Sequence, residues 1–126
     1  MSKENRSVAV ESDAKEIVLA FINALNDEDF ESAKRYISDN LVFVGVMVTR
    51  NGADAYMNDM EKMKLKYRIK KSFVEGDDVC LFYDIDMGGK TIFSCGWYQV
   101  EEGKIKSFKV IFDPRPLLEL GDKPGK

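Results

Sequence analysis

The sequence predicts an α+β domain in which three N-terminal helices pack on a strongly bent antiparallel sheet. Up to about residue 60, apolar residues recur at the three- and four-residue spacing of helices. From Tyr67 onward they recur at every second position, and three turn signals divide this half into hairpins. With 126 residues, the chain is long enough for one hydrophobic core and too short for two domains. We expect one domain at 13–118 and loose ends at 1–12 and 119–126.

The N-terminal half carries the signals of three helices. Asp13 to Glu16 has the form of a capping box, which predicts the start of the first helix. The polar residues 26–29 stop this helix and cap a second, shorter one. An apolar, β-branched strand is expected at 41–48, after which Asn51 caps a third helix. The apolar positions of the three helices are, in order, Ala14, Ile17, Val18, Phe21 and Leu25; Phe30, Ala33, Tyr36 and Ile37; Ala53, Tyr56, Met57 and Met60.

Four further strands are predicted as an antiparallel meander over 66–75, 78–87, 90–101 and 104–113. The turns are Gly76-Asp77, Gly88-Gly89 and Glu102-Gly103, all typical of two-residue hairpins. Such hairpins fix the register and give one aromatic-rich face, which we expect to meet the helices. A bulge would exchange the faces, because a slip of one residue turns every side chain over. This face carries Tyr67, Ile69, Phe73, Cys80, Phe82, Asp84, Phe93, Cys95, Trp97, Phe108, Val110 and Phe112.

Composition excludes several classes of function. The chain has no histidine, so His-based triads and His metal ligands are absent. Its two cysteines have no metal-ligand spacing, and we expect neither a metal nor a cofactor. The net charge of −3 argues against a nucleic-acid partner, although 62–71 is a basic run. A polar N-terminus and the lack of a long apolar run predict a cytoplasmic protein with no membrane partner.

The order of elements, together with three short motifs, resembles the cystatin-like α+β cone of the nuclear transport factor 2-like (NTF2-like) superfamily. Within it, the chain is most similar to SnoaL-like proteins, including the ketosteroid isomerase type. The motifs are residues 25–30, residues 74–79, and residues 102–105 leading into 111–114. The resemblance covers residues 13–118 and implies a pocket between helices and sheet. It leaves the function open, because the superfamily contains isomerases, cyclases, dehydratases, hydrolases and non-catalytic binding proteins.

The resemblance also implies a test for steroid isomerase chemistry. Such isomerases use an Asp base on the first strand, a Tyr on the first helix and an Asp in mid-sheet. In this sequence the base position falls near Val44 or Gly45, the helix position at Phe21 and the sheet position at Cys95. None of these side chains can transfer a proton or donate a strong hydrogen bond, so this mechanism is not expected.

Asp84 is the one carboxylate that the predicted register places on the aromatic face. A carboxyl group in an apolar pocket has a raised pKa and could transfer protons near neutral pH, which makes Asp84 the candidate catalytic residue. Alternatively, Asp84 lies at the mouth of the cone and pairs with a lysine. Cys95 is interpreted as an inert thiol, because no cation on its face would lower its pKa.

The expected function is binding of a small apolar or weakly anionic organic molecule, without catalysis or at least without isomerase chemistry. The alternative is an isomerase-, cyclase- or dehydratase-type enzyme that uses Asp84. A homodimer is expected through the outer sheet face, whose aliphatic and tyrosine side chains are Tyr83, Ile85, Ile92, Tyr98 and Ile111. The aromatic residues either line an open pocket or fill it. The residues predicted to line the pocket are Phe21, Tyr56, Met60, Tyr67, Ile69, Phe82, Cys95, Trp97, Phe108, Val110 and Phe112.

Overall fold

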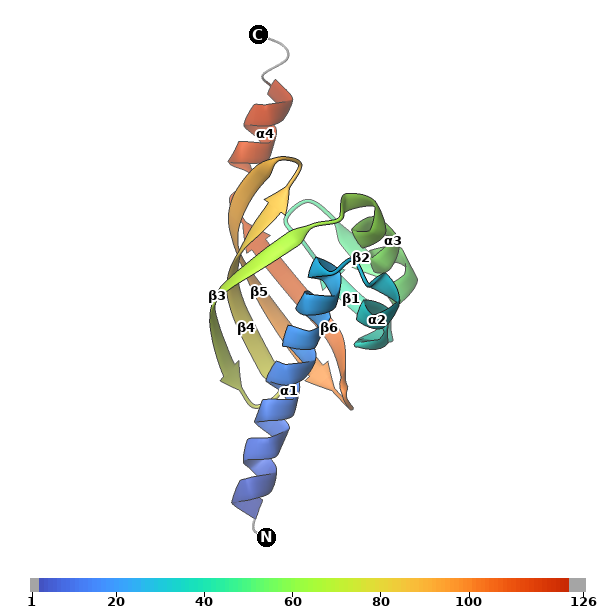
Figure 1. Ribbon diagram of the computed structural model, residues 1–126, viewed down its shortest axis with the longest axis vertical. Helices are drawn as coiled ribbons and strands as arrows, with labels where there is room; N and C mark the ends of the chain where they lie inside the picture. Colours follow the sequence, from blue (N-terminus) through green and yellow to red (C-terminus); the bar gives the residue numbers. More distant parts are fainter. Residues whose placement is uncertain (1–2, 123–126) are drawn as a thin grey trace.

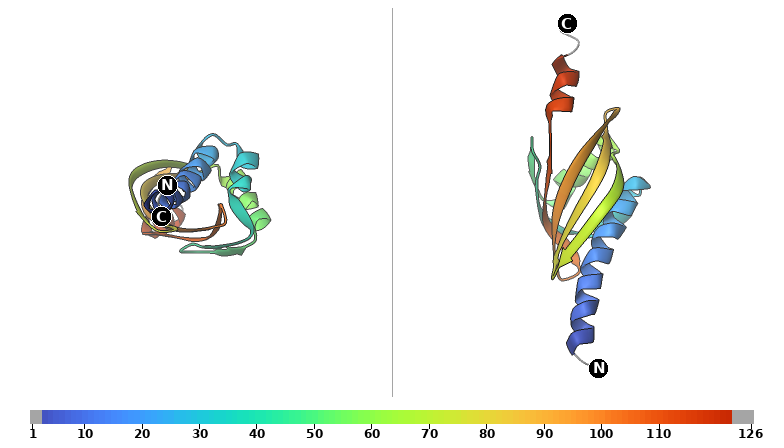
Figure 2. Two further views of the ribbon diagram at one scale, coloured as in Figure 1. Left: turned by 90° about the horizontal axis from the view of Figure 1, so that it is seen from below. Right: turned by 90° about the vertical axis from the view of Figure 1, so that its left-hand side faces the viewer.

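The computed structural model describes residues 3–122, which form one six-stranded sheet and four helices (Figure 1). The strand order is β2-β1-β6-β5-β4-β3. The helices are α1 (Lys3–Asn26), α2 (Phe30–Arg35), α3 (Ala53–Met63) and α4 (Arg115–Asp122). The strands are β1 (Ile37–Val44), β2 (Thr49–Asn51), β3 (Lys66–Glu75), β4 (Asp78–Met87), β5 (Lys90–Glu101) and β6 (Lys104–Phe112). The α+β class and the strongly bent sheet are confirmed, and Figure 2 shows α1, α2 and α3 on the concave side of the curved sheet.

The C-terminal meander has the predicted strands. β3, β4 and β5 have the expected bounds, and β6 ends one residue early, at Phe112. Both glycines of the Gly88-Gly89 turn have positive φ, at 58° and 83°, which two-residue hairpin turns of this kind require. The sheet is mixed rather than antiparallel, because β1 pairs in parallel with β6.

The N-terminal elements differ from the prediction at their ends. α1 begins at Lys3 rather than Asp13, so residues 3–12 continue the helix and extend beyond the sheet (Figure 1). α2 ends at Arg35, and Ile37 begins β1 instead of ending that helix. α3 follows Gly52, which has φ of 98° and no side-chain cap, so Asn51 is not its cap. α4 was not predicted, and residues 123–126 of the expected tail lie outside the described residues.

Asn26, the last residue of α1, fixes this helix to β3. Its side-chain amide donates to the carbonyl oxygen of Tyr67 at 2.9 Å and accepts from the Tyr67 N–H at 2.7 Å. The ammonium group of Lys66 donates to the Asn26 carbonyl oxygen at 2.7 Å. Asp29 accepts from the N–H of Ser32 at 3.2 Å and so caps α2, as the polar run predicted.

Two β-bulges divide the predicted aromatic face between the two sides of the sheet. The β4–β5 register is as predicted, with Phe82 opposite Cys95. One bulge lies in β3, where Lys70 is the extra residue between Ile69 and Lys71. The other lies in β6, where Lys106 is the extra residue between Ile105 and Ser107, opposite Val100 and Gln99 of β5. Each bulge adds one residue to its strand, so the side chains beyond it lie on the opposite face of the sheet from that predicted. Tyr67, Phe108, Val110 and Phe112 therefore face the helices, whereas Phe73, Cys80, Phe82, Asp84, Phe93, Cys95 and Trp97 lie on the outer face.

The helix-facing side of the sheet forms an aromatic core. The hydroxyl oxygens of Tyr83 and Tyr98 are hydrogen-bonded at 2.6 Å, and both residues are fully buried. The ring of Tyr98 stacks on that of Phe108 with 4.6 Å between centroids. Gly96 lies between the two tyrosines, and a Cβ atom there would come within 2.3 Å of the Tyr83 hydroxyl oxygen. Glycine is therefore required by space at this position.

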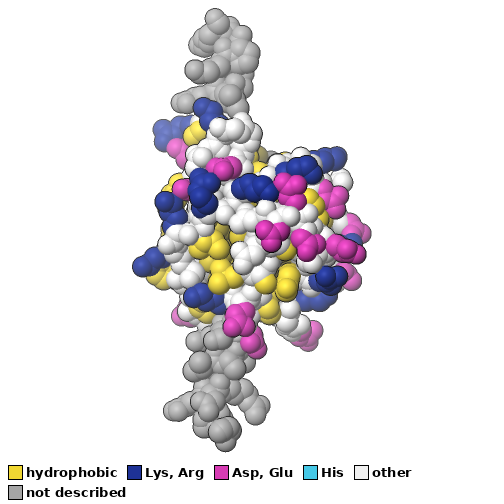
Figure 3. All heavy atoms as spheres, in the orientation of Figure 1, with side chains coloured by type: hydrophobic (Ala, Val, Ile, Leu, Met, Phe, Trp, Pro, Cys, Tyr) yellow, Lys and Arg dark blue, Asp and Glu magenta, His cyan; other side chains and the backbone are white. Residues whose placement is uncertain are grey.

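The surface carries charges of both signs. Figure 3 shows acidic and basic side chains side by side over α2 and α3, where Lys34 forms an ion pair with Asp54. Within residues 3–122, no helix is long and apolar enough to cross a membrane.

Candidate functional site

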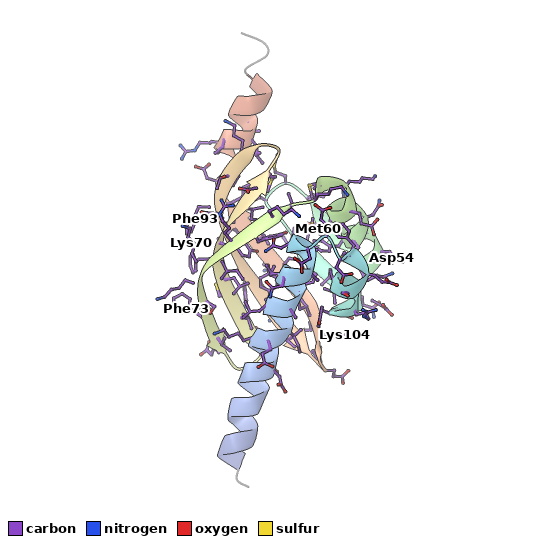
Figure 4. The ribbon with its side chains drawn as sticks, viewed as in Figure 1. Asp54, Met60, Lys70, Phe73, Phe93 and Lys104 are labelled. Carbon is purple, nitrogen blue, oxygen red and sulfur yellow. The ribbon has the colours of Figure 1, made fainter. Side chains whose placement is uncertain are left out.

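An apolar cavity of about 170 Å³ lies between α3, the β1–β2 loop and the inner face of the sheet. Leu117 of α4 contributes to its wall. Met60 lies on the side of α3 that faces the sheet and reaches this space (Figure 4). The lining residues are Phe43, Gly45, Val46, Met47, Val48, Tyr56, Asp59, Met60, Met63, Leu65, Tyr67, Ile85, Met87, Phe108, Val110, Phe112 and Leu117.

The β1–β2 loop forms the exposed side of the cavity. The N–H of Gly45 donates to the Val48 carbonyl oxygen at 2.8 Å, which closes the loop. Val46, Met47 and Val48 are apolar but 41%, 59% and 37% exposed. Apolar side chains that line a cavity and also reach solvent are typical of the entrance to a binding site.

The cavity contains two tyrosine hydroxyl groups. A hydrogen bond between Tyr56 and Tyr67 raises the pKa of Tyr56 and lowers that of Tyr67, as expected if Tyr56 is the donor. The Tyr67 hydroxyl donates in turn to the thioether sulfur of Met60, at 3.8 Å. Burial is the main influence on both groups and raises both pKa values, so both hydroxyls remain protonated at neutral pH. A thioether is a weak acceptor, so the Tyr67 proton has a poor partner.

Asp59, on α3, is the one charged residue in the cavity wall among the side chains described. Its Oδ2 accepts a hydrogen bond from Nε of Arg50, on β2, at 2.6 Å. The carboxylate is therefore already ion-paired and hydrogen-bonded to a protein side chain.

Four lining residues are methionines: Met47, Met60, Met63 and Met87. Methionine has three rotatable bonds and a polarizable sulfur, so it adapts to ligands of different shape. The methionine side chains therefore give this wall several possible conformations.

Comparison with known proteins identifies the family. The family profile described as "SnoaL-like domain" matches residues 18–108, which is most of the chain. The chain belongs to the SnoaL-like domain family. No curated protein matches at a significant level.

Solved structures place this SnoaL-like domain among NTF2-like proteins. An NTF2-like protein of unknown function from Cytophaga hutchinsonii is 54% identical, with a TM-score of 0.82 over 83% of this chain and 94% of that one. An LEH-like epoxide hydrolase from M. tuberculosis is 23% identical, with a TM-score of 0.75 over 86% and 89%. An NTF2-like protein of unknown function from Burkholderia xenovorans is 16% identical, with a TM-score of 0.75 over 82% and 85%. The two more distant similarities establish the shared fold only.

The cavity of the SnoaL-like domain includes only part of the predicted pocket. Phe21 is fully buried and packs against Tyr56 and Phe108, behind the wall rather than in it. Ile69 is on the helix-facing side but lies 38% exposed, away from the cavity. Phe82, Cys95 and Trp97 lie on the outer face, because the bulges exchange the sides. The predicted residues that do line the cavity are Tyr56, Met60, Tyr67, Phe108, Val110 and Phe112.

Asp84 does not lie on the cavity side of the SnoaL-like domain. It is on the outer face of β4, opposite Phe93, and its Oδ2 lies 3.5 Å from Nζ of Lys70. Asp84 therefore pairs with a lysine, which is the alternative environment that the sequence suggests for it. The catalytic role predicted for Asp84 depended on the other placement and loses its basis.

Several lining residues were not predicted. The sequence predicts a strand over 41–48, which includes the β1–β2 loop, and it places Leu117 at the end of the domain. Neither position suggests that these residues line the cavity. Asp59 directly precedes Met60 on α3 and lies three residues after Tyr56. This helical spacing places it beside Tyr56 and is a sequence signal for its position. Cys95 does not occupy the isomerase sheet position, since Ser94 and Gly96 are the residues of β5 that face inward there.

Proposed function

We propose that this SnoaL-like domain binds a small, mostly apolar organic molecule that carries one hydrogen-bond-accepting oxygen. The observation that carries this proposal is the Tyr67 hydroxyl, a buried donor in an apolar cavity. Among the described residues, its acceptor is the Met60 sulfur at 3.8 Å. Binding without catalysis is the function that the cavity supports best.

The volume of the cavity limits the size of the ligand. Drug-sized ligands occupy pockets of about 300–1,000 Å³, whereas an apolar cavity of about 150 Å³ holds benzene. A cavity of about 170 Å³ therefore suits a molecule with a single ring. The methionines allow some variation around this size.

The polarity of the wall limits the ligand's chemistry. A carbonyl, ether or hydroxyl oxygen is a much better acceptor than a thioether, so it would take the proton of Tyr67 from Met60. An anionic ligand would place its charge in an apolar space beside the Asp59 carboxylate, which is unfavourable. Of the two ligand types expected from the sequence, the apolar one is therefore favoured.

The enzymatic alternative has less support. Among the described side chains, Asp59 is the only carboxylate in the wall, and Arg50 already holds it at 2.6 Å. The epoxide hydrolase named above shares the fold at 23% identity, which carries no argument for its reaction here.

Tyr67→Phe tests the role of the oxygen. We expect this variant to bind cyclohexanone about fivefold more weakly than the native protein, because a neutral hydrogen bond contributes about 1 kcal/mol. Binding of methylenecyclohexane, which has a similar shape and no oxygen, should be unchanged. Isothermal calorimetry or NMR titration measures both affinities.

Tyr83→Phe is the matched control, since Tyr83 is also a buried tyrosine of the sheet but does not line the cavity. It should leave both affinities unchanged. Equal loss of the two ligands in Tyr67→Phe would contradict the role of the oxygen. Failure of both molecules to bind the native protein would overturn the binding function itself.

We also propose that two copies associate through the outer sheet face. The prediction of which residues lie on this face was largely wrong. Ile111 faces outward as expected, whereas Tyr83, Ile85, Ile92 and Tyr98 are buried on the helix-facing side. Phe73, Phe93, Trp97 and Ile111 are 45–64% exposed on this face. Phe73 and Phe93 lie on the side of the sheet away from the helices in Figure 4. Such an apolar area is unusual on a free surface.

A second copy is the occupant that we propose, because a twofold interface buries the same apolar face of both copies at once. Charged residues of both signs, Lys109, Glu75 and Asp78, lie around the apolar centre, and Lys70 is paired with Asp84 of the same copy. We expect sedimentation equilibrium to give a dimer at micromolar concentration and Phe93→Lys to give a monomer. A native protein that remains monomeric at high micromolar concentration would refute the dimer.

A further inference from the structure

Cys80 and Cys95 form a pair of thiols at the centre of the outer sheet face. Their sulfur atoms are 3.3 Å apart. They are diagonal neighbours on β4 and β5, since Cys80 lies opposite Trp97 and Cys95 opposite Phe82. Both are half-buried and line a groove that also includes Phe73, Trp97 and Asp78. The pair is thus accessible from solvent and held by two central strands.

The distance between the sulfurs suits a bridging atom better than a direct bond. The separation is longer than the bond of about 2.0 Å in a disulfide, and both cysteines are free thiols. An atom bound about 2.3 Å from each sulfur, with an angle of about 90–110° between the bonds, holds the sulfurs about 3.3–3.8 Å apart. The observed separation of 3.3 Å lies at the lower end of that range.

The number of available ligands restricts which atom can bridge. Structural zinc needs four ligands, the chain has no histidine, and no group of three potential metal-binding residues exists in the described part of the chain. A trivalent arsenic centre needs only two protein sulfurs, because an organic group or a hydroxide supplies its third bond. Two isolated thiols therefore fit arsenic and do not complete a zinc site.

We propose that Cys80 and Cys95 are a dithiol site for trivalent arsenicals. In the reaction, the two As–OH bonds of the hydrated arsenical break and two As–S bonds form. Each thiol proton leaves with one hydroxide as water, and no atom changes oxidation state. The proposal uses only the outer face and is independent of the ligand cavity.

The raised pKa of Cys95 is consistent with this chemistry. Burial and, second, the neighbouring Cys80 thiol raise the pKa of Cys95 to about 11. Thiol–disulfide exchange needs a thiolate, so Cys95 is a poor attacking thiol in that reaction at neutral pH. Condensation with an arsenical consumes the thiol form and releases its proton as water.

The test uses the reduced full-length protein and phenylarsine oxide. We expect intact mass spectrometry to show one arsenical per chain and both thiols blocked to a maleimide. A small dithiol should remove the arsenical, whereas an equal concentration of monothiol should not. Cys80→Ser and Cys95→Ser should each bind it at least about 100-fold more weakly, because the second bond is intramolecular only when both thiols are present. If circular dichroism shows that a serine variant does not fold, the alanine variant at the same position takes its place.

Three results would overturn the proposal: no adduct, two arsenicals per chain, or undiminished binding by either single-cysteine variant. Loss of two hydrogens with oxidised glutathione, in place of the adduct, would show a redox pair instead. The proposed dimer would cover the thiols, so capture should slow as protein concentration rises. Capture that is independent of concentration would count against the dimer while leaving the dithiol site supported.

Discussion

Gly96→Ala is expected to lower the free energy of unfolding by about 3 kcal/mol and the melting temperature by roughly 12 °C. The new Cβ atom would come within 2.3 Å of the Tyr83 hydroxyl oxygen and 2.7 Å of Cε1 of Tyr98. Both rings are fully buried, so neither can move aside without opening the core. Their 2.6 Å hydrogen bond would be lost at the same time. Thermal and urea denaturation measure the change.

A double variant distinguishes the clash with the tyrosine pair from a general effect of replacing glycine by alanine on the free energy of unfolding. Adding Tyr83→Phe to Gly96→Ala should recover part of the stability, because it removes the atom that the methyl group meets first. Gly45→Ala is the matched control. Its Cβ atom would approach Phe43 only to 3.0 Å in the exposed β1–β2 loop, so a loss within about 1 kcal/mol is expected. An equal loss at the two glycines would show that the tyrosine pair is not the cause.

Phe108→Ala is expected to cost about 4 kcal/mol, or roughly 15 °C in melting temperature. Phe108 is 3% exposed, and its ring lies within 4.6–6.0 Å of the rings of Tyr98, Phe43, Tyr56 and Phe21. Its removal leaves a large void that joins the ligand cavity, which the rigid sheet cannot close. Calorimetric melting in the absence of ligand gives the effect.

Phe93→Ala provides the comparison, because the sequence places Phe93 and Phe108 on one face and the structure separates them. Phe93 is 58% exposed on the outer face. At low protein concentration, where copies do not associate, its loss should cost less than about 0.5 kcal/mol. If the two variants were equally unstable, the division of the faces by the bulges would be wrong.

The sequence predicts local features of this fold well. Hairpin ends depend on a few residues, such as Gly88-Gly89, whose positive φ values only certain residues tolerate. The β4–β5 register follows from that turn and is correct. α1, by contrast, continues ten residues before the predicted capping box, because a capping box stabilises a helix start but does not prevent an earlier one.

The candidate site could be predicted less well because it depends on bulges. A bulge at Lys70 in β3 or at Lys106 in β6 changes no apolar pattern strongly enough to be seen in the sequence. Each nevertheless moves side chains to the other side of the sheet. Trp97, Phe82 and Asp84, which the sequence places on the pocket side, therefore lie on the outer face. Ile85, Met87 and the β1–β2 loop line the cavity instead.

The parallel pairing of β1 with β6 has a consequence for the order of folding. Every other pair in the sheet joins strands that follow each other in the chain, whereas Ile37 lies opposite Ile105. Closing so long a loop has a high entropy cost before any contact compensates it. The three C-terminal hairpins can form from nearby residues, so we expect β1 to dock onto a meander that already exists. The β1–β2 loop would then reach its place over the cavity only in this last step, and the candidate site would be the latest part of the molecule to assemble.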